Sequence, residues 1–355
     1  MKGKIGGSFS MFGGGDGFAE FNKAIERSPK SPNAYFERAQ AYCNQGDLDR
    51  GIADYDQVIA LKPDYSSAYL NRGNAYYLKN DYARAIEDFD AVLRMKPDNP
   101  RAYCSRGTVY AASGDYDRGI ADLTKAIKLK PDLMEAHLNR GNTYMDLNDR
   151  DHAIADYTRV IKLAPTFPGG YFSRGNAYTE KGEYDLALAD FTEMLRHNPG
   201  DATAYFKRGN VYFEQEDYEH AMAEFTLAVE AYPYYADAFI NRGCVYSLLQ
   251  DHDRAIVDYN RAINLDANSA IAYFKRGISY QDKGDCVRAI ADYTKALKLN
   301  PCYAEAYTNR GVAYCKKGKY KAACADWKRA LQLDPSDALA KDWLDLMENK
   351  QITLG

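Results

Sequence analysis

Histidine and cysteine are among the side chains of this sequence that could hold a metal ion or act as nucleophiles. The five histidines and seven cysteines are scattered, and no two cysteines form a CxxC pair, which favours reduced thiols over a zinc or disulfide framework. No HExxH, GxSxG, P-loop or EF-hand pattern occurs. The glycine-rich run at residues 13–17 follows no strand pattern, so it indicates a flexible leader rather than a phosphate loop. We therefore expect no enzymatic activity, no metal site and no cofactor.

Arginine and carboxylate side chains form a more regular pattern. An arginine recurs every 34 residues, at Arg38, Arg72, Arg106, Arg140, Arg174, Arg208, Arg242, Arg276 and Arg310. An acidic residue follows each of them by 16 positions, from Asp54 to Asp326, with Glu224 as the one glutamate. The arginines could bind an acidic ligand, or they could pair with these carboxylates. Because every arginine has a matching carboxylate in the chain, we predict a structural ladder of ion pairs.

The same period of 34 residues governs the whole sequence and defines the helices that must position these side chains. Prolines recur at this spacing from Pro29 to Pro233 and again at Pro301 and Pro335. Nine uninterrupted units span residues 32–337 when the proline is placed at position 32 of each unit. An aromatic residue or histidine at position 4, a small residue at position 8 and tyrosine at position 11 fall on one face of a first helix. A small residue at position 20, an aromatic residue at position 24 in eight units and an aliphatic residue at position 28 predict a second helix.

The ends of each helix are also marked in the sequence. Position 15 is glycine or asparagine in seven units, as suits a left-handed residue after a helix. Position 16 is acidic in eight units, which favours the start of the second helix. The proline at position 32 ends that helix. Each unit is thus a helix hairpin that must stack on its neighbours to bury its apolar faces.

This pattern resembles the tetratricopeptide repeat. The resemblance implies an all-α, right-handed superhelical solenoid of antiparallel helix hairpins. Residues 1–16 are expected to be a flexible leader, 17–31 a partial repeat with a lone second helix, and 338–355 a C-terminal capping helix and tail. One departure is the arginine at position 7, where the family usually has leucine.

In tetratricopeptide proteins, the first helices line a concave groove that binds peptides. Carried over to this sequence, the resemblance places a set of polar and apolar residues there: Asn71, Asn74, Asn139, Asn142, Asn176, Phe206, Asn210, Asn241, Lys275 and Asn309. Asparagine both donates and accepts hydrogen bonds, so a row of them could pair with an extended peptide backbone. These residues could equally be repeat consensus that packs without contacting a ligand.

A sharper resemblance concerns the carboxylate clamp of chaperone adaptors. Asn210, Asn241 and Lys275 match three of its five positions. Phe206 and Ile271 occupy the two lysine positions, so most of the positive charge of a clamp is missing. A looser peptide groove is the better interpretation of this region.

Net charge and hydropathy limit the kinds of partner. The formal net charge is −4, and no long lysine or arginine run occurs, which argues against nucleic acid. No apolar stretch has the length of a membrane span, so we expect no membrane partner and a cytoplasmic location. We predict an adaptor or scaffold that binds a protein or peptide. The alternatives are a self-associating scaffold, hence a possible homo-oligomer, or a regulatory partner subunit of a separately encoded enzyme.

Overall fold

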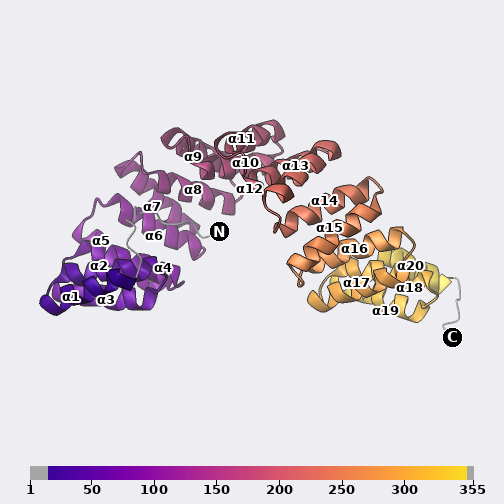
Figure 1. Cartoon of the computed structure of the whole chain (residues 1–355), viewed down its shortest axis with the longest axis horizontal. Coiled ribbons are helices and arrows are strands. Elements are labelled where there is room, and N and C mark those ends of the chain that lie inside the picture. The colour runs from indigo at the N-terminus through magenta and orange to yellow at the C-terminus, as the bar shows by residue number, and fades with distance from the viewer. Residues whose placement is uncertain (1–14, 350–355) are drawn as a thin grey trace. The chain divides into compact units, whose positions relative to one another are not determined.

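The computed structural model describes residues 15–349, and this part of the chain consists of twenty helices without a strand. Figure 1 shows successive helices folding back on one another as hairpins. The chain divides into two compact units, residues 1–183 and 184–355. The leader expected at 1–16 lies outside the described residues up to position 14, and α1 already includes residues 15 and 16.

Unit 1 contains the first ten helices. Their bounds are α1 Gly15–Arg27, α2 Pro32–Asn44, α3 Leu48–Leu61, α4 Ser66–Leu78, α5 Tyr82–Met95, α6 Pro100–Ala112, α7 Tyr116–Leu129, α8 Met134–Asp146, α9 Arg150–Leu163 and α10 Pro168–Lys181. From α2 onward, the even-numbered helices cover positions 1–13 or 1–14 of the repeat and the odd-numbered ones cover positions 17–30. The 34-residue period of the sequence therefore matches one hairpin of the structure.

Unit 2 contains the other ten helices. Their bounds are α11 Tyr184–His197, α12 Ala202–Glu214, α13 Tyr218–Ala231, α14 Ala236–Leu248, α15 His252–Leu265, α16 Ala270–Asp282, α17 Cys286–Leu299, α18 Ala304–Lys316, α19 Tyr320–Leu333 and α20 Ala338–Asn349. The terminal helix α20 covers the last hairpin, where Trp343 stacks on Trp327 with ring centroids 5.5 Å apart.

The core of most hairpins is a ring from the second helix packed against a small residue of the first, and Leu123 takes the place of the ring in the third repeat. Tyr259 is 1% exposed and lies directly against Gly243. A Cβ atom added to Gly243 would come within 2.7 Å of the Tyr259 ring, so this contact requires glycine. The first repeat has Ala39 at the equivalent place, packed in the cluster that contains Tyr55. The small residue at position 8 and the aromatic residue at position 24 thus set the distance between the two helices.

The turns between the helices confirm the expected end signals. The residue at position 15 has a positive φ in all nine repeats, for example +86° at Gly114 and +62° at Asn80. Glu216 and Gln250 adopt the same conformation without being glycine or asparagine. The aspartate that follows caps the second helix in seven repeats by accepting a hydrogen bond from the backbone N–H three residues on, as Asp251 does from Arg254 at 3.0 Å.

Candidate functional site

The arginine at position 7 pairs with the carboxylate at position 23 of its own repeat, as the sequence predicts. In the α14–α15 hairpin, Nε and Nη2 of Arg242 donate to the two oxygens of Asp258, both at 2.8 Å. The Asp258 side chain is 5% exposed and that of Arg242 16%. The same pair is described in seven further repeats: Arg38–Asp54, Arg72–Asp88, Arg106–Asp122, Arg140–Asp156, Arg208–Glu224, Arg276–Asp292 and Arg310–Asp326. These arginines therefore support the hairpins and are poorly placed to bind an acidic ligand.

Each of these arginines also reaches the preceding repeat, which the sequence reasoning missed. Nη1 of Arg242 donates to Oγ1 of Thr226 on α13, at 3.3 Å. The acceptor always stands at position 25 of the preceding second helix, and the other described pairs are Arg38–Asn22, Arg72–Asp56, Arg106–Asp90, Arg140–Thr124, Arg174–Thr158, Arg208–Thr192, Arg276–Asn260 and Arg310–Thr294. A signal was present in the sequence, because position 25 is aspartate, threonine or asparagine in eight repeats. The guanidinium group thus joins three helices of two repeats.

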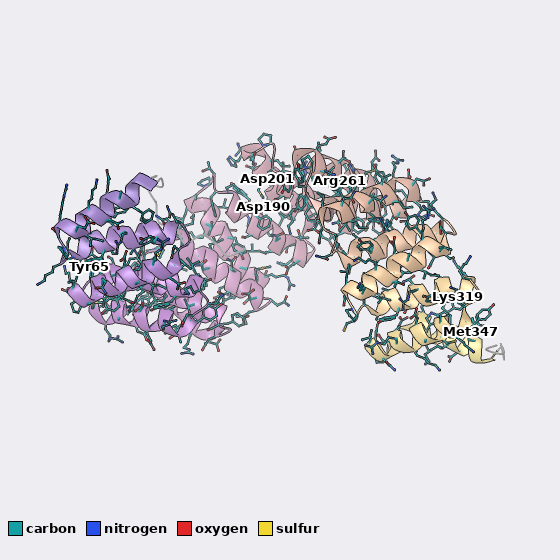
Figure 2. All side chains as sticks on the ribbon, turned by 60° about the horizontal axis from the view of Figure 1, so that its bottom comes forward. Tyr65, Asp190, Asp201, Arg261, Lys319 and Met347 are labelled. Carbon is teal, nitrogen blue, oxygen red and sulfur yellow. The ribbon has the colours of Figure 1, made fainter. Side chains whose placement is uncertain are left out.

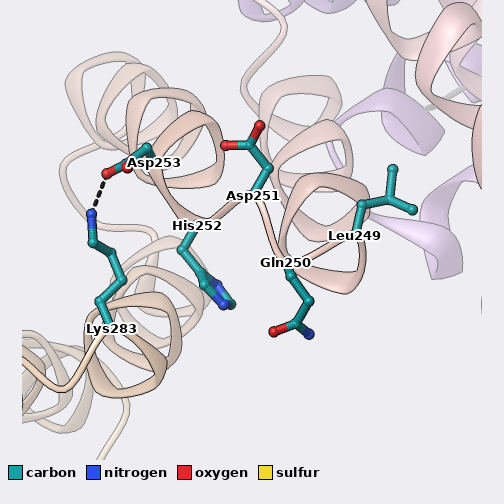
Figure 3. Close-up of a pocket in the computed structure, with 6 residues that line it drawn as sticks. All are labelled: Leu249, Gln250, Asp251, His252, Asp253 and Lys283. Atoms are coloured by element: carbon teal, nitrogen blue, oxygen red, sulfur yellow. Dashed lines mark hydrogen bonds and ion pairs between the residues drawn. The ribbon is translucent and has the colours of Figure 1, made fainter.

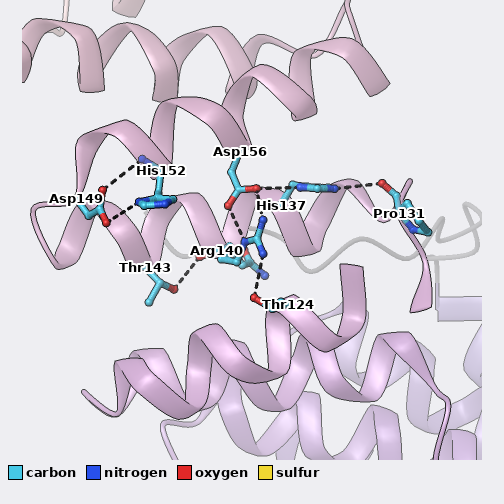
Figure 4. Close-up of polar contacts among 9 residues, drawn as sticks. Thr124, Pro131, His137, Arg140, Thr143, Asp149, His152 and Asp156 are labelled. Carbon is cyan, nitrogen blue, oxygen red and sulfur yellow. Dashed lines mark hydrogen bonds and ion pairs between the residues drawn. The ribbon is translucent and has the colours of Figure 1, made fainter. Parts of the chain in front are cut away.

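The fourth repeat adds a buried histidine to this arrangement (Figure 4). His137 occupies the place of a position-4 tyrosine, with Nδ1 3.0 Å from Oδ1 of Asp156 and Nε2 3.1 Å from the carbonyl oxygen of Pro131. Tyr205 makes the corresponding bond to the Pro199 carbonyl with its hydroxyl, at 2.9 Å. His137 therefore takes the structural role that tyrosine has at position 4 of other repeats, as its repeat position indicates.

Asp156 is the carboxylate on which these contacts meet. Burial acts to raise its pKa, but hydrogen bonds from Arg140 and His137 outweigh burial and leave the pKa below its usual value. In the second repeat the balance is reversed, because burial raises the pKa of Asp88 above its usual value despite the bond from Arg72. The extra donor from His137 is one difference between the two sites.

In unit 1, the predicted asparagines lie on the first helices, with different partners. Nδ2 of Asn139 donates to Oγ1 of Thr108 on the preceding first helix, at 2.8 Å. Asn142 is exposed, and its Oδ1 accepts from the hydroxyl of Tyr157 at 2.8 Å. Burial raises the pKa of the Tyr55 hydroxyl, and the side chain of Asn71 partly opposes that shift. The amides of Asn139 and Asn142 are therefore already oriented by the protein.

Asn74 and Asn176, also on first helices of unit 1, are half-buried. The Oδ1 atom of Asn74 is buried and has no hydrogen-bond partner in the structure. The ring at position 24 of this repeat is Phe89, which lacks the hydroxyl that Tyr157 offers to Asn142. An acceptor left in this state is costly.

In unit 2, two predicted residues contact each other directly. Nδ2 of Asn241 on α14 donates to Oδ1 of Asn210 on α12, at 2.8 Å, and both side chains are half-buried. Lys275 follows on α16 at the position equivalent to Asn241, with Nζ 6.0 Å from the centroid of the Phe274 ring. Asn309 on α18 donates to the carbonyl oxygen of Glu305 in its own helix, at 2.9 Å.

Phe206 packs against other aromatic rings of its repeat. Its centroid lies 5.9 Å from that of Phe225 and 4.8 Å from that of Tyr235. The first repeat has the same arrangement, in which Phe36 packs on Tyr55 and on Tyr65, labelled in Figure 2. Phe274, Tyr293 and Tyr303 repeat it in unit 2. Sequence reasoning missed these aromatic trios because their third member, at position 34, comes after the proline that ends the second helix.

A polar hollow of about 370 Å³ lies at the turn between α14 and α15 (Figure 3). It is lined by residues 249–253 of the turn and by Lys283 of the next repeat. Nζ of Lys283 pairs with Asp253. The equivalent turn between α2 and α3 has a hollow of about 460 Å³ bounded by Lys79 and Asp49. The recurrence identifies a feature of the repeat, and these hollows contain none of the predicted site residues.

Among the described residues, no group of three or more histidine, cysteine, aspartate or glutamate side chains is arranged to hold a metal ion. None of the helices in that part of the chain is both long enough and apolar enough to cross a membrane.

Comparison with known proteins agrees with the repeat pattern. Tetratricopeptide-repeat family models match residues 18–65, 36–100 and 172–236, residues 73–140, and residues 135–167 and 304–337; a TPR-repeat model matches 246–284 and 282–318. A search among curated proteins gave no match.

Solved structures share the fold. The yeast Tom70 structure has a TM-score of 0.54 at 16% identity, over 95% of this chain and 92% of that one. The Cut9 and Hcn1 hetero-tetramer structure of the APC/C has a TM-score of 0.55 at 14% identity, over 93% and 81%. A tetratricopeptide repeat protein from Parabacteroides merdae has a TM-score of 0.54 at 21% identity, over 73% and 98%. With family models matching most of the sequence and one hairpin per 34 residues, this chain belongs to the tetratricopeptide repeat family.

Proposed function

We propose that this protein is a scaffold that binds an extended segment of a partner protein along its first helices, with the principal site on α12, α14 and α16. The tetratricopeptide fold supports protein–protein interaction in general. The hydrogen bond between Asn241 and Asn210 is the single observation that supports this particular site.

That bond fixes the orientation of two amide groups. Nδ2 of Asn241 donates to Oδ1 of Asn210. The remaining polar atom of each amide, Oδ1 of Asn241 and Nδ2 of Asn210, makes no hydrogen bond to another described residue. These atoms are an acceptor on Asn241 and a donor on Asn210. One peptide unit offers the complementary donor and acceptor, so the pair suits a main chain of any sequence. Each hydrogen bond contributes about 0.5–1.5 kcal/mol.

The neighbouring side chains favour particular residues of the bound segment. Ile271 is 46% exposed on α16, and Lys275 lies one helical turn further on. This combination suits a segment with an apolar side chain close to a carboxylate. Phe206 lies one turn before Asn210 on α12, where its packed ring supports the asparagine from within the repeat. Asn309 extends the row to α18.

A second stretch of the same kind is proposed in unit 1, formed by Asn71, Asn74, Asn139, Asn142 and Asn176. Asn142 supports it, because this asparagine is exposed and its Oδ1 is held by the hydroxyl of Tyr157, which leaves its Nδ2 as a donor for a bound segment.

The test begins with selection of linear peptides from a displayed library on the immobilised chain, followed by calorimetric titration of the selected peptides. The double variant Asn210→Ala/Asn241→Ala should raise Kd by about 5- to 150-fold, which corresponds to about 1–3 kcal/mol for two hydrogen bonds. Asn264→Ala, an exposed asparagine on the second helix α15, is the matched control and should leave Kd unchanged.

Methylation of the peptide backbone gives a second, independent readout. Methylating one peptide nitrogen at a time should weaken binding by about 2- to 13-fold at the nitrogen that faces Asn241, as expected for one hydrogen bond, and the same methylation should have no further effect in the double variant. If the double variant binds every selected peptide as tightly as the original chain, the proposed site is wrong.

A further inference from the structure

Helix α1 has the sequence of a second helix, and no helix of the described residues pairs with it as a first helix. Residues 20–25 read Glu-Phe-Asn-Lys-Ala-Ile, and residues 224–229 of α13 read Glu-Phe-Thr-Leu-Ala-Val at the same repeat positions. In α13 the face formed by Glu224, Phe225 and Ala228 is buried, with exposures of 8%, 0% and 0%. In α1, Glu20 and Ala24 are exposed and Phe21 is only half-buried.

The opposite face of α1 contacts α2, as the second helix of a complete repeat contacts the first helix of the next one. Phe18 stacks on Tyr42 with ring centroids 4.6 Å apart, and Oδ1 of Asn22 accepts from Nη1 of Arg38 at 2.7 Å. The exposed face is therefore the one that a first helix covers in every complete repeat. We name the face formed by Glu20, Phe21 and Ala24 the α1 end face.

Helix α12 shows what covers this face in the sixth repeat. Nη2 of Arg208 donates to Oε1 of Glu224 at 2.7 Å. Gly209 lies against Phe225 so closely that an added Cβ atom would be 2.7 Å from the ring. The occupant thus needs an arginine followed by glycine or alanine on one face of an amphipathic helix. The α1 end face offers the matching carboxylate, because Glu20 makes no hydrogen bond or ion pair with another described residue.

Two occupants from this sequence fit poorly. Residues 16 positions before Glu20 and Phe21 are Lys4 and Ile5, and the branched side chain of Ile5 would stand where the complete repeats have glycine or alanine. The terminal helix α20 of a second copy has Leu344 and Asp345 in these places, which removes the cation and sets a second carboxylate opposite Glu20. The charge and shape of the face match a different helix.

We propose that the α1 end face binds an amphipathic helix of a partner protein that carries an arginine followed by glycine or alanine, and so completes a hairpin across two chains. Arginine pairs with Glu20, and the small residue allows the partner helix to pack on Phe21 and Ala24. This surface is separate from the asparagines of the first helices and does not depend on their role.

The probe is a fluorescein-labelled peptide with the sequence of residues 202–214. Its binding to the full chain is measured by fluorescence anisotropy. Saturable binding is expected, and Glu20→Lys should weaken it at least tenfold. A peptide with Arg208→Glu should lose binding to the original chain and regain it with Glu20→Lys. A peptide with Gly209→Leu should bind at least tenfold more weakly. Asp345→Lys, the same charge reversal on the exposed face of α20, is the control and should leave binding unchanged.

Three results would overturn the proposal. The first is binding that is absent or indifferent to Glu20→Lys, with the helical circular dichroism spectrum retained. The second is much tighter peptide binding after removal of residues 1–14, which would make that segment the occupant. The third is a dimer in sedimentation that Glu20→Lys dissociates, which would make a second copy the occupant.

Discussion

The ion pair between Arg242 and Asp258 should be strongly coupled in a double-mutant cycle. Asp258→Ala leaves a guanidinium group that is 16% exposed with only the hydroxyl of Thr226 as a described acceptor. Breaking a buried pair costs about 3–5 kcal/mol, and the partial exposure of Arg242 lowers our expectation to about 2–4 kcal/mol. Arg242→Leu, which leaves the carboxylate of Asp258 without its partner, should cost a similar amount.

The double variant should be far less destabilised than the sum of the two changes, because it removes both charges together. We expect a net cost of about 1 kcal/mol and a coupling free energy of about 3 kcal/mol or more. A long repeat array does not unfold in two states, so the measurement is hydrogen exchange of the amides in α14 and α15. Each single change should accelerate their exchange about 30-fold or more, since 1.4 kcal/mol is a factor of ten.

Arg254 provides the control for this cycle. It also contacts an aspartate and lies 4.8 Å from the Tyr246 ring, but its side chain is 64% exposed. Arg254→Leu should therefore change exchange much less than Arg242→Leu does. Equal effects of the two substitutions, or additive effects in the Arg242 and Asp258 cycle, would refute the claim that the buried pair supports the hairpin.

Three further outcomes follow from the repeat geometry. Gly311→Ala should destabilise the last hairpin by about 1–3 kcal/mol, measured by hydrogen exchange of the amides in α18 and α19, because the added methyl group collides with Trp327; unchanged exchange would contradict this. Gln250→Gly should stabilise by about 0.5–1 kcal/mol by relieving a φ of +63°, and a loss of stability would contradict it. The lowered pKa of Asp156 means that its ionised form stabilises the fold above pH 4 or so and that this contribution is lost as pH falls through the folded-state pKa. The stability difference between the original chain and Asp156→Asn should accordingly shrink between pH 6 and pH 3, and a constant difference would count against it.

Features set by local sequence were predictable here. The second helices begin after a capping aspartate such as Asp251 and end before the proline, and the left-handed turn residue was expected at Gly114 and Asn80. The ladder of arginines and carboxylates was also predictable, because both partners belong to one hairpin. Two residues, Glu216 and Gln250, adopt the left-handed turn without the expected residue type, since the hairpin geometry imposes it.

Contacts between repeats were harder to predict. The bond from Arg242 to Thr226 depends on how closely one hairpin stacks on the next, which no spacing within a repeat specifies. The same holds for the bond between Asn241 and Asn210, which lie 31 residues apart on neighbouring first helices. The sequence suggested both asparagines individually, but their contact required the stacking distance. The bound segment itself stays a proposal, because the polar atoms of the amides define a chemistry without defining a partner.

The stacked pair Trp327 and Trp343 gives the C-terminal end of the chain a fluorescence signal of its own. These are the two tryptophans of the sequence, and both lie at its C-terminal end, whereas the 31 tyrosines are distributed over the repeats. Fluorescence excited at the red edge of the absorption band will therefore report the opening of α19 and α20, while tyrosine signals report the rest of the array. If the last hairpin frays before the others, the two signals will change at different denaturant concentrations, and the order of the transitions will give the direction in which the array unfolds.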